Sequence, residues 1–251
     1  MAVDISGAGK RGGRPQRALF GGAFNPLHKG HIALAEEIER KLGLEEVVFV
    51  PTGLPPHKER PAVSCEERRH MVELAIAGRP GWRVSDIECR LPGPSLTSRT
   101  LTHLSLSPPP FFVMGEDAFI DFLEWGGPEI ILSLSHLVVV TRPGGAGVRA
   151  RNTLLRVLDL SESFLTGENV PALDDLRSGR MVEWVAALPS FGTTLRLLAI
   201  DSLEISSTRL RSDIASGNTE RWAHLLPEPV KSYIVETGLY REKSCGHNKM
   251  E

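Results

Sequence analysis

The chain carries little net charge, few cysteines and no long apolar segment, and each shortage excludes a class of protein. Its formal net charge is −2 over 251 residues, so bulk attraction to nucleic acid or to an anionic membrane is not indicated. No run approaches the roughly 18 apolar residues that a transmembrane helix needs. The first 16 residues lack the apolar middle of a signal peptide. We therefore expect a cytoplasmic protein with no nucleic-acid partner and no membrane partner.

The three cysteines, Cys65, Cys89 and Cys245, are odd in number and lie far apart in the sequence. They form no CxxC pair, and their spacing fits no disulfide framework of a secreted domain. The sequence therefore predicts no disulfide, which agrees with a reducing cytoplasm.

Short apolar runs alternate with helical patterns along most of the chain, which predicts βαβ units and a parallel sheet. The continuous apolar runs at residues 110–115 and 136–141 are typical of strands buried on both faces. The predicted fold class is therefore α/β, an open parallel sheet flanked by helices, with ligands at the carboxyl ends of its strands.

The chain length predicts a single domain, which we place over residues 17–241, between a disordered tail at 1–16 and a flexible tail at 242–251. Residues 143–192 interrupt the rhythm, and we interpret them as an insertion. Weaker helical patterns predict three short helices, at residues 117–125, 153–160 and 171–187.

The most informative segment is GGAFNPLHKGH, residues 21–31, which follows the first predicted strand and leads into a helix. Gly21 and Gly22 would let backbone approach a ligand closely. His28 and His31 would lie at a helix N-terminus, which favours anions, so we expect both imidazoles to donate to phosphate. A structural helix cap and a metal pair are the alternatives, but no His/Cys/Asp cluster supplies further metal ligands.

This segment resembles the GGxFxPxHxGH signature of the nucleotidyltransferase superfamily, and residues 205–211, ISSTRLR, resemble its second signature, ISSTxxR. Further short runs are similar to the bacterial nicotinate-nucleotide adenylyltransferases, among them Pro55-Pro56-His57-Lys58, Ser95-Leu96-Thr97, Gly115-Glu116-Asp117 and Arg142-Pro143-Gly144. The resemblance implies a Rossmann-like sheet. It also implies transfer of the adenylyl group of ATP to nicotinate mononucleotide, giving nicotinate adenine dinucleotide and pyrophosphate in NAD biosynthesis. Mg²⁺ is implied as cofactor, held mainly by phosphates, and self-association into a homo-oligomer stays open.

The same resemblance implies roles for individual residues. His31, His28, Arg211 and Lys58 would be catalytic. The residues expected to bind ATP are Gly21, Gly22, Phe24, His28, His31, Gly115, Asp117, Ile205, Ser206, Ser207, Thr208 and Arg211. Those expected to bind nicotinate mononucleotide are Asn25, Lys58, Thr97, Trp125 and Arg142.

Several of these residues also have a purely structural interpretation. Ser206 and Asp117 could be ordinary helix N-caps, Trp125 could be core, and Arg142 could be solvated. The motifs contain no pair of acid and base carboxylates. None is needed, because a phosphate monoester with a second pKa near about 6 is already largely dianionic at neutral pH.

Two departures from the family pattern lie beside proposed contacts: Asn25 stands where Asp is common, and Leu96 where Tyr is common. The alternatives for function are the same chemistry on nicotinamide mononucleotide or phosphopantetheine, and a non-catalytic nucleotide-binding regulator. A fragment of a class I aminoacyl-tRNA synthetase is disfavoured, because the chain lacks a Lys-Met-Ser-Lys-Ser type run.

Overall fold

A computed structural model describes residues 16–56, 61–141, 148–161, 175–176, 178, 180–201 and 205–241. Its centre is a seven-stranded sheet in the order β3-β2-β1-β4-β5-β7-β6. All neighbouring strands are parallel except β6 and β7, which are antiparallel. The predicted α/β class with a mainly parallel open sheet is therefore confirmed. The strands are β1 (Arg17–Gly22), β2 (Glu46–Pro51), β3 (Trp82–Val84), β4 (Phe111–Gly115), β5 (His136–Thr141), β6 (Glu183–Leu188) and β7 (Thr193–Ala199).

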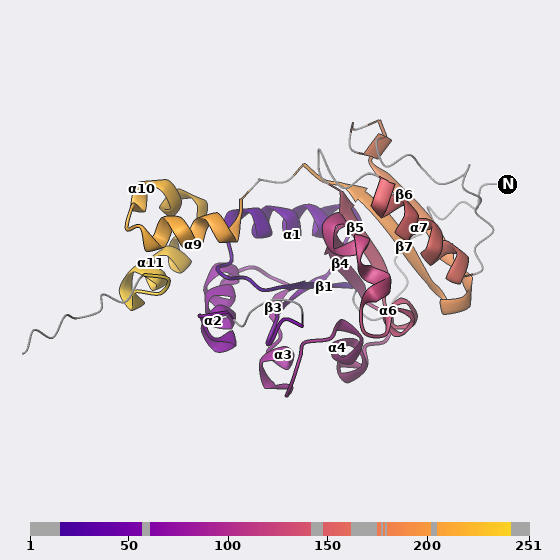
Figure 1. Ribbon diagram of the computed structural model, residues 1–251, viewed down its shortest axis with the longest axis horizontal. Helices are drawn as coiled ribbons and strands as arrows, with labels where there is room; N and C mark the ends of the chain where they lie inside the picture. Colours follow the sequence, from indigo (N-terminus) through magenta and orange to yellow (C-terminus); the bar gives the residue numbers. More distant parts are fainter. Residues whose placement is uncertain are drawn as a thin grey trace, which may run out of the picture.

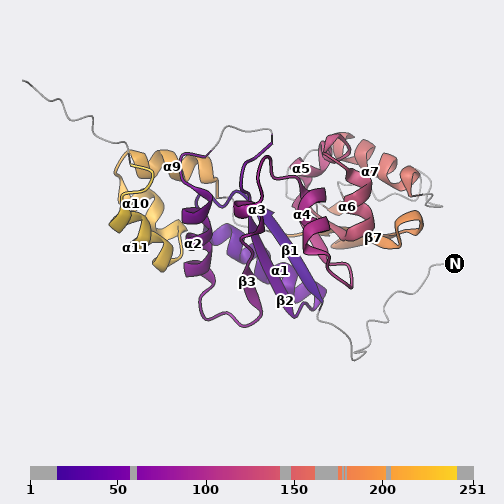
Figure 2. The same ribbon diagram turned by 90° about the horizontal axis from the view of Figure 1, so that it is seen from below.

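Helices cover both faces of this sheet (Figure 1 and Figure 2). They are α1 (Lys29–Leu42), α2 (Cys65–Ile76), α3 (Ile87–Arg90), α4 (Thr97–Leu104), α5 (Glu116–Ile120), α6 (Pro128–Leu134), α7 (Val148–Leu160), α9 (Ser207–Ala215), α10 (Thr219–Trp222) and α11 (Glu228–Thr237). None of the helices within the described ranges is long and apolar enough to span a lipid bilayer.

Alternation along the strands creates two separate apolar cores, because successive side chains of a strand point to opposite faces. In β1, Ala18 and Phe20 pack with Ile38 of α1, whereas Leu19 between them belongs to the other core. That second core contains Leu101 of α4 and Leu132 of α6. Alternating side chains of β1 thus pack with α1 on one face of the sheet and with α4 and α6 on the other.

The C-terminal helices lie beside α2 (Figure 1), and a third apolar cluster joins them to it. Met71 of α2 packs with Leu210 of α9, Trp222 of α10 and Ile234 of α11. Because α2 also packs against the strands through Val72, this cluster fixes the position of α9 relative to the sheet.

Two of the predicted helices are wrong. Residues 117–125 form α5 and a separate 3₁₀ turn at Phe122–Glu124. Within 171–187, residues 183–187 belong to β6, an edge strand paired with β7. Its burial is irregular, so periodicity alone could not separate strand from helix. In the third predicted helix, residues 153–160 lie inside α7, and Leu154 is fully buried.

The predicted absence of a disulfide is also wrong, because Cys65 and Cys89 are bonded. The two residues are 24 positions apart in sequence, but the start of α2 meets α3 with 5.5 Å between their Cα atoms. Sequence spacing could not show this contact, since it depends on how two helices pack. The cysteine argument for a reducing cytoplasm therefore fails, and the cytoplasmic location stays a prediction.

We expect loss of this disulfide to lower the free energy of unfolding by about 3 kcal/mol, because the bond restricts a loop of this size in the unfolded chain. The measurement is urea unfolding of the C65S/C89S double variant beside the parent protein, both with and without reductant. C245S is the matched control and should behave like the parent. Equal midpoints for the parent with and without reductant would contradict the prediction.

Candidate active site

The turn between β1 and α1 carries the glycine and histidine motif at the carboxyl end of a central strand. A Cβ on Gly22 would meet the ring of Phe24 at 3.0 Å, so glycine lets that ring fold back into the core. Phe24 itself has a positive φ of 45° and is 2% exposed. The backbone of this turn is therefore held in a tight and specific path.

His28 and His31 stack on each other, with ring centroids 3.7 Å apart and planes inclined by 20°. The backbone N–H of His28 donates to Nδ1 of His31 at 3.2 Å. A neutral His31 ring that accepts at Nδ1 carries its proton on Nε2. His31 can therefore donate from Nε2 to a ligand.

Burial lowers the pKa of His28 from 6.5 to about 4. Burial, and then the nearby His28, also lower the pKa of His31 well below its usual value. Both rings are therefore neutral near pH 7, so they would meet phosphate as hydrogen-bond donors rather than as fixed cations.

This burial makes stability depend on pH with a defined sign. His28 has a lower pKa folded than unfolded, so below about pH 6.5 the unfolded chain binds the additional proton. Stability is lost as the pH falls from about 6.5 to 4, and His28 contributes about 2 kcal/mol of loss between pH 7 and pH 5. Urea unfolding at both pH values should show this loss, and H28Q should reduce it. If H28Q loses as much stability between pH 7 and pH 5 as the parent protein, His28 is not the cause of the loss.

The second motif lies directly against the first. Arg211 donates from Nη1 to the carbonyl oxygen of Asn25 at 2.9 Å, and Ser207 Oγ donates to the carbonyl oxygen of Pro26 at 3.4 Å. Arg211 Nη2 also donates to Thr208 Oγ1 at 3.2 Å. The two motifs, remote in sequence, thus form one site at the end of β1.

Ser206 is the N-cap of α9, and its Oγ accepts from the backbone N–H of Arg209 at 3.4 Å. The structural interpretation of this serine is thus observed. It is compatible with a role in binding, because the N-terminus that it caps faces the turn of the first motif through Ser207.

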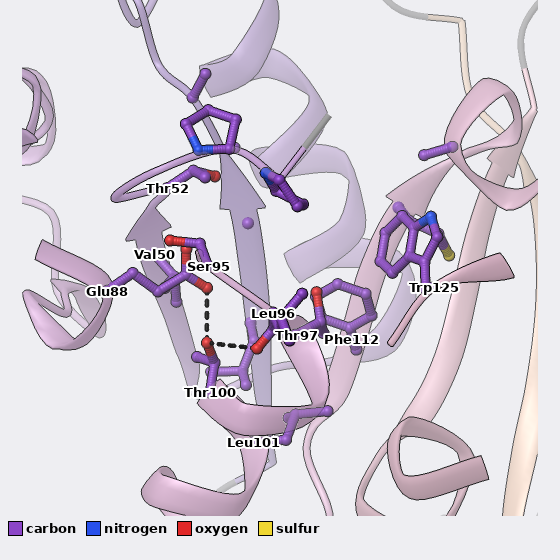
Figure 3. A pocket seen from close by; sticks show the side chains of 18 of the residues that line it. Val50, Thr52, Glu88, Ser95, Leu96, Thr97, Thr100, Leu101, Phe112 and Trp125 are labelled. Atoms are coloured by element: carbon purple, nitrogen blue, oxygen red, sulfur yellow. Dashed lines mark hydrogen bonds between the residues drawn. The ribbon is translucent and has the colours of Figure 1, made fainter. Parts of the chain in front are cut away.

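Beside the turn lies a cavity of about 350 Å³ at the carboxyl ends of β1, β2 and β4. Figure 3 shows Glu88 and Ser95 on one side of it and Trp125 on the other. Its walls include Gly21, Gly22, Ala23, Thr52, Glu88, Ser95, Leu96, Thr97, Phe112, Gly115 and Trp125. Thr97 and Trp125, both expected to bind the mononucleotide, therefore share one cavity with the first glycines.

Hydrogen bonds hold the two sides of this cavity. Glu88 accepts from Thr100 Oγ1 at 2.8 Å (Figure 3), and burial raises the pKa of Glu88. Ser98 Oγ donates to the carbonyl oxygen of Gly126, next to Trp125. Helix α4 thereby ties α3 to the segment that carries the indole.

Several expected site residues do not line this cavity, and His28, His31, Asn25 and Arg211 belong instead to the contact between the two motifs beside it. Asp117 is exposed in the first turn of α5 and does not line the cavity. Ile205 is half-buried and packs with the C-terminal apolar cluster. Lys58 and Arg142 lie outside the described residues. So do the predicted N-terminal tail up to residue 15 and the C-terminal tail.

The structure shows what the two residues that depart from the family pattern contact. The side-chain Oδ1 of Asn25 accepts from the hydroxyl of Tyr240 at 2.7 Å. Leu96 lines the cavity, and a Cβ on Gly126 would contact its side chain at 3.4 Å. Tyr240 was not predicted to reach the site, and neither was Glu88.

The glycine turn, the paired histidines at a helix entry and the facing arginine agree with the nucleotidyltransferase resemblance of the sequence, and the comparison with known proteins shows the same class. Residues 19–213 match the model of the cytidylyltransferase-like family. A probable nicotinate-nucleotide adenylyltransferase of Dehalococcoides mccartyi is 34% identical over 230 residues, which cover 90% of this chain and 97% of that protein. A protein of the same description from Desulfatibacillum aliphaticivorans is 36% identical, with 88% and 98% covered. The chain belongs to the nicotinate-nucleotide adenylyltransferase family.

Solved structures agree on the fold. The nicotinic acid mononucleotide adenylyltransferase of Plasmodium falciparum, in complex with NaAD, superposes with a TM-score of 0.61 over 90% of this chain and 98% of that one. Its sequence identity is 16%, so this likeness concerns the fold alone.

Proposed function

We propose that the chain transfers the adenylyl group of ATP to nicotinate mononucleotide, releasing pyrophosphate and forming nicotinate adenine dinucleotide for NAD biosynthesis. The observation that carries the proposal is the direct contact of the two motifs, through Arg211 and Asn25, beside a cavity that contains Thr97 and Trp125. The names of the relatives support the same reaction.

The reaction needs positioning and charge stabilisation rather than a general base. The mononucleotide phosphate is already ionised and attacks the α-phosphorus of ATP in line with the departing pyrophosphate. His31 would donate from Nε2 to an α-phosphate oxygen, and His28 would contact a neighbouring oxygen. Donors fixed before the reaction begins stabilise charge that develops in the transition state.

The leaving pyrophosphate would lie at the N-terminus of α9. Ser207 and Thr208 stand in its first turn, where free backbone N–H groups favour phosphate. Arg211 lies one turn further along, and its guanidinium donates to Thr208 Oγ1 in that first turn. We therefore expect Arg211 to neutralise charge on the β- and γ-phosphates.

Magnesium is part of the proposal. No group of three or more His, Cys, Asp or Glu residues suited to a metal ion occurs in the part of the chain that the structure describes. The N-terminus of α9, where we place the triphosphate, carries hydroxyl and arginine donors, so we expect Mg²⁺ to enter with ATP on phosphate oxygens. The ion would neutralise phosphate charge there.

The cavity would hold the nicotinate ring. Trp125 supplies a flat apolar face, and Thr97 supplies a hydroxyl at the start of α4. The substrate carboxylate would accept from Thr97 and from backbone N–H groups beside Trp125. An amide in place of the carboxylate would bring its own N–H donors toward these donors, which disfavours nicotinamide mononucleotide.

The test is pyrophosphate release from ATP and Mg²⁺ with nicotinate mononucleotide, nicotinamide mononucleotide or phosphopantetheine at equal concentration. We expect release with the first acceptor to exceed the other two. Faster pyrophosphate release with another acceptor would show that this acceptor, and not nicotinate mononucleotide, is the substrate. No release with any acceptor, from a protein that still binds ATP, would favour the non-catalytic regulator.

A further inference from the structure

Arg68 is a buried charged residue that the proposed reaction leaves without a role. It lies in the second turn of α2 and is 1% exposed. Buried charges are normally paired with an opposite charge. Among the described residues, however, no carboxylate forms an ion pair with this guanidinium within 4.0 Å.

The guanidinium instead donates to four backbone carbonyl oxygens from three segments. Nη1 donates to Ala23 at 2.6 Å, Nη2 to Thr52 at 2.6 Å and to Gly53 at 3.2 Å, and Nε to Val63 at 3.3 Å. Ala23 and Thr52 both line the cavity. From its position on α2, Arg68 therefore joins the motif turn after β1 to the loop after β2.

These contacts also fix where the attached N–H groups point. In a planar trans peptide, the carbonyl oxygen and the N–H of the following residue point in opposite directions. The oxygens of Thr52 and Gly53 face Arg68, and the N–H groups of Gly53 and Leu54 donate away from it to Ser95 Oγ, at 2.9 and 3.2 Å. Ser95 lines the cavity (Figure 3).

The peptide between Ala23 and Phe24 follows the same rule. Its oxygen faces Arg68, so the N–H of Phe24 is directed away from Arg68. Across the described ranges, no acceptor forms a hydrogen bond with this N–H. Its neighbour Ala23 lines the cavity, and His28 and His31 follow in the same motif.

We propose that Arg68 is a positioning residue for adenylyl transfer. It orients three peptide units so that their N–H groups face the substrate side, and it presents the N–H of Phe24 to a phosphate oxygen of the bound nucleotides. This inference rests on the proposed function, since it needs nucleotide phosphates beside the first motif.

The experiment compares R68K and R68M with R69M in the pyrophosphate-release assay, and it measures kcat, both KM values and thermal unfolding. Arg69 is the matched control, because it is the neighbouring arginine of α2 and pairs with Glu66 and Glu73 away from the cavity. We expect kcat/KM to fall about 100-fold in R68M and about 10-fold in R68K, whose single ammonium cannot reach all four oxygens. R69M should keep parental kinetics.

R68K keeps the charge and fills most of the space, so it tests the inference even where R68M does not fold. A lower unfolding temperature of R68K with unchanged kcat and KM would show a structural role alone and would overturn the inference. A third variant, R68A, leaves space where the guanidinium was. Added methylguanidinium should restore part of its activity, whereas no restoration in folded R68A would count against positioning. If the parent protein itself releases no pyrophosphate, the proposed function fails, which is a distinct result.

Discussion

Replacing His31 by alanine is expected to lower kcat by about 100- to 1,000-fold, the usual effect of removing one fixed donor to a developing oxyanion. The neutral ring accepts at Nδ1 from the backbone N–H of His28, so its remaining proton lies on Nε2. Loss of the ring removes this donor from the α-phosphate. Steady-state pyrophosphate release at saturating substrates measures the effect.

Two further variants serve as controls for H31A. H103A removes an exposed histidine of α4 that does not line the cavity, and it should leave kcat unchanged. H31Q retains an amide donor and should recover part of the loss. A kcat within threefold of the parent for folded H31A would show that His31 does not stabilise the transition state.

The sequence predicted those parts of the molecule that have a strong local pattern, whereas two helices predicted from weaker patterns were wrong. Two glycines before two histidines define a turn and a helix entry whatever lies elsewhere. The unbroken apolar runs of β4 and β5 similarly indicate strands buried on both faces. The alternation of strands and helices also predicted a parallel sheet, and β4 and β5 do pair in parallel.

What the sequence did not predict depends on packing between distant segments. Arg68 had a weak signal, since it lies three and four residues before Met71 and Val72 on the buried face of α2. A charged residue in such a stripe is usually solvated at its tip. Only the three-dimensional convergence of four carbonyl oxygens explains why this one is buried.

Asn25 shows a similar limit. Its difference from the family's aspartate was visible in the sequence, but its partner was not. Tyr240 lies at the far end of the chain and reaches Asn25 Oδ1 because the C-terminal helices pack on α2. The roles predicted for Asn25 and the other site residues stay predictions until variants are measured.

Arg211 should give the second large effect. R211A removes the cation that we place beside the leaving pyrophosphate, and we expect kcat to fall by about 100- to 1,000-fold. R211K keeps the charge but cannot contact Asn25 and Thr208 with two nitrogens together, so we expect about a tenfold loss. Pyrophosphate release and the KM for ATP measure both.

Helix α9 offers a matched control for this prediction. Arg209 lies two residues earlier, is exposed, and has a carboxylate oxygen of Asp213 at 3.9 Å. R209A removes the same charge from the same helix, so general attraction of ATP to positive charge predicts equal losses for both variants. A specific contact instead predicts loss in R211A alone. Equal effects would therefore show that Arg211 acts only through the local field and not through contact with pyrophosphate.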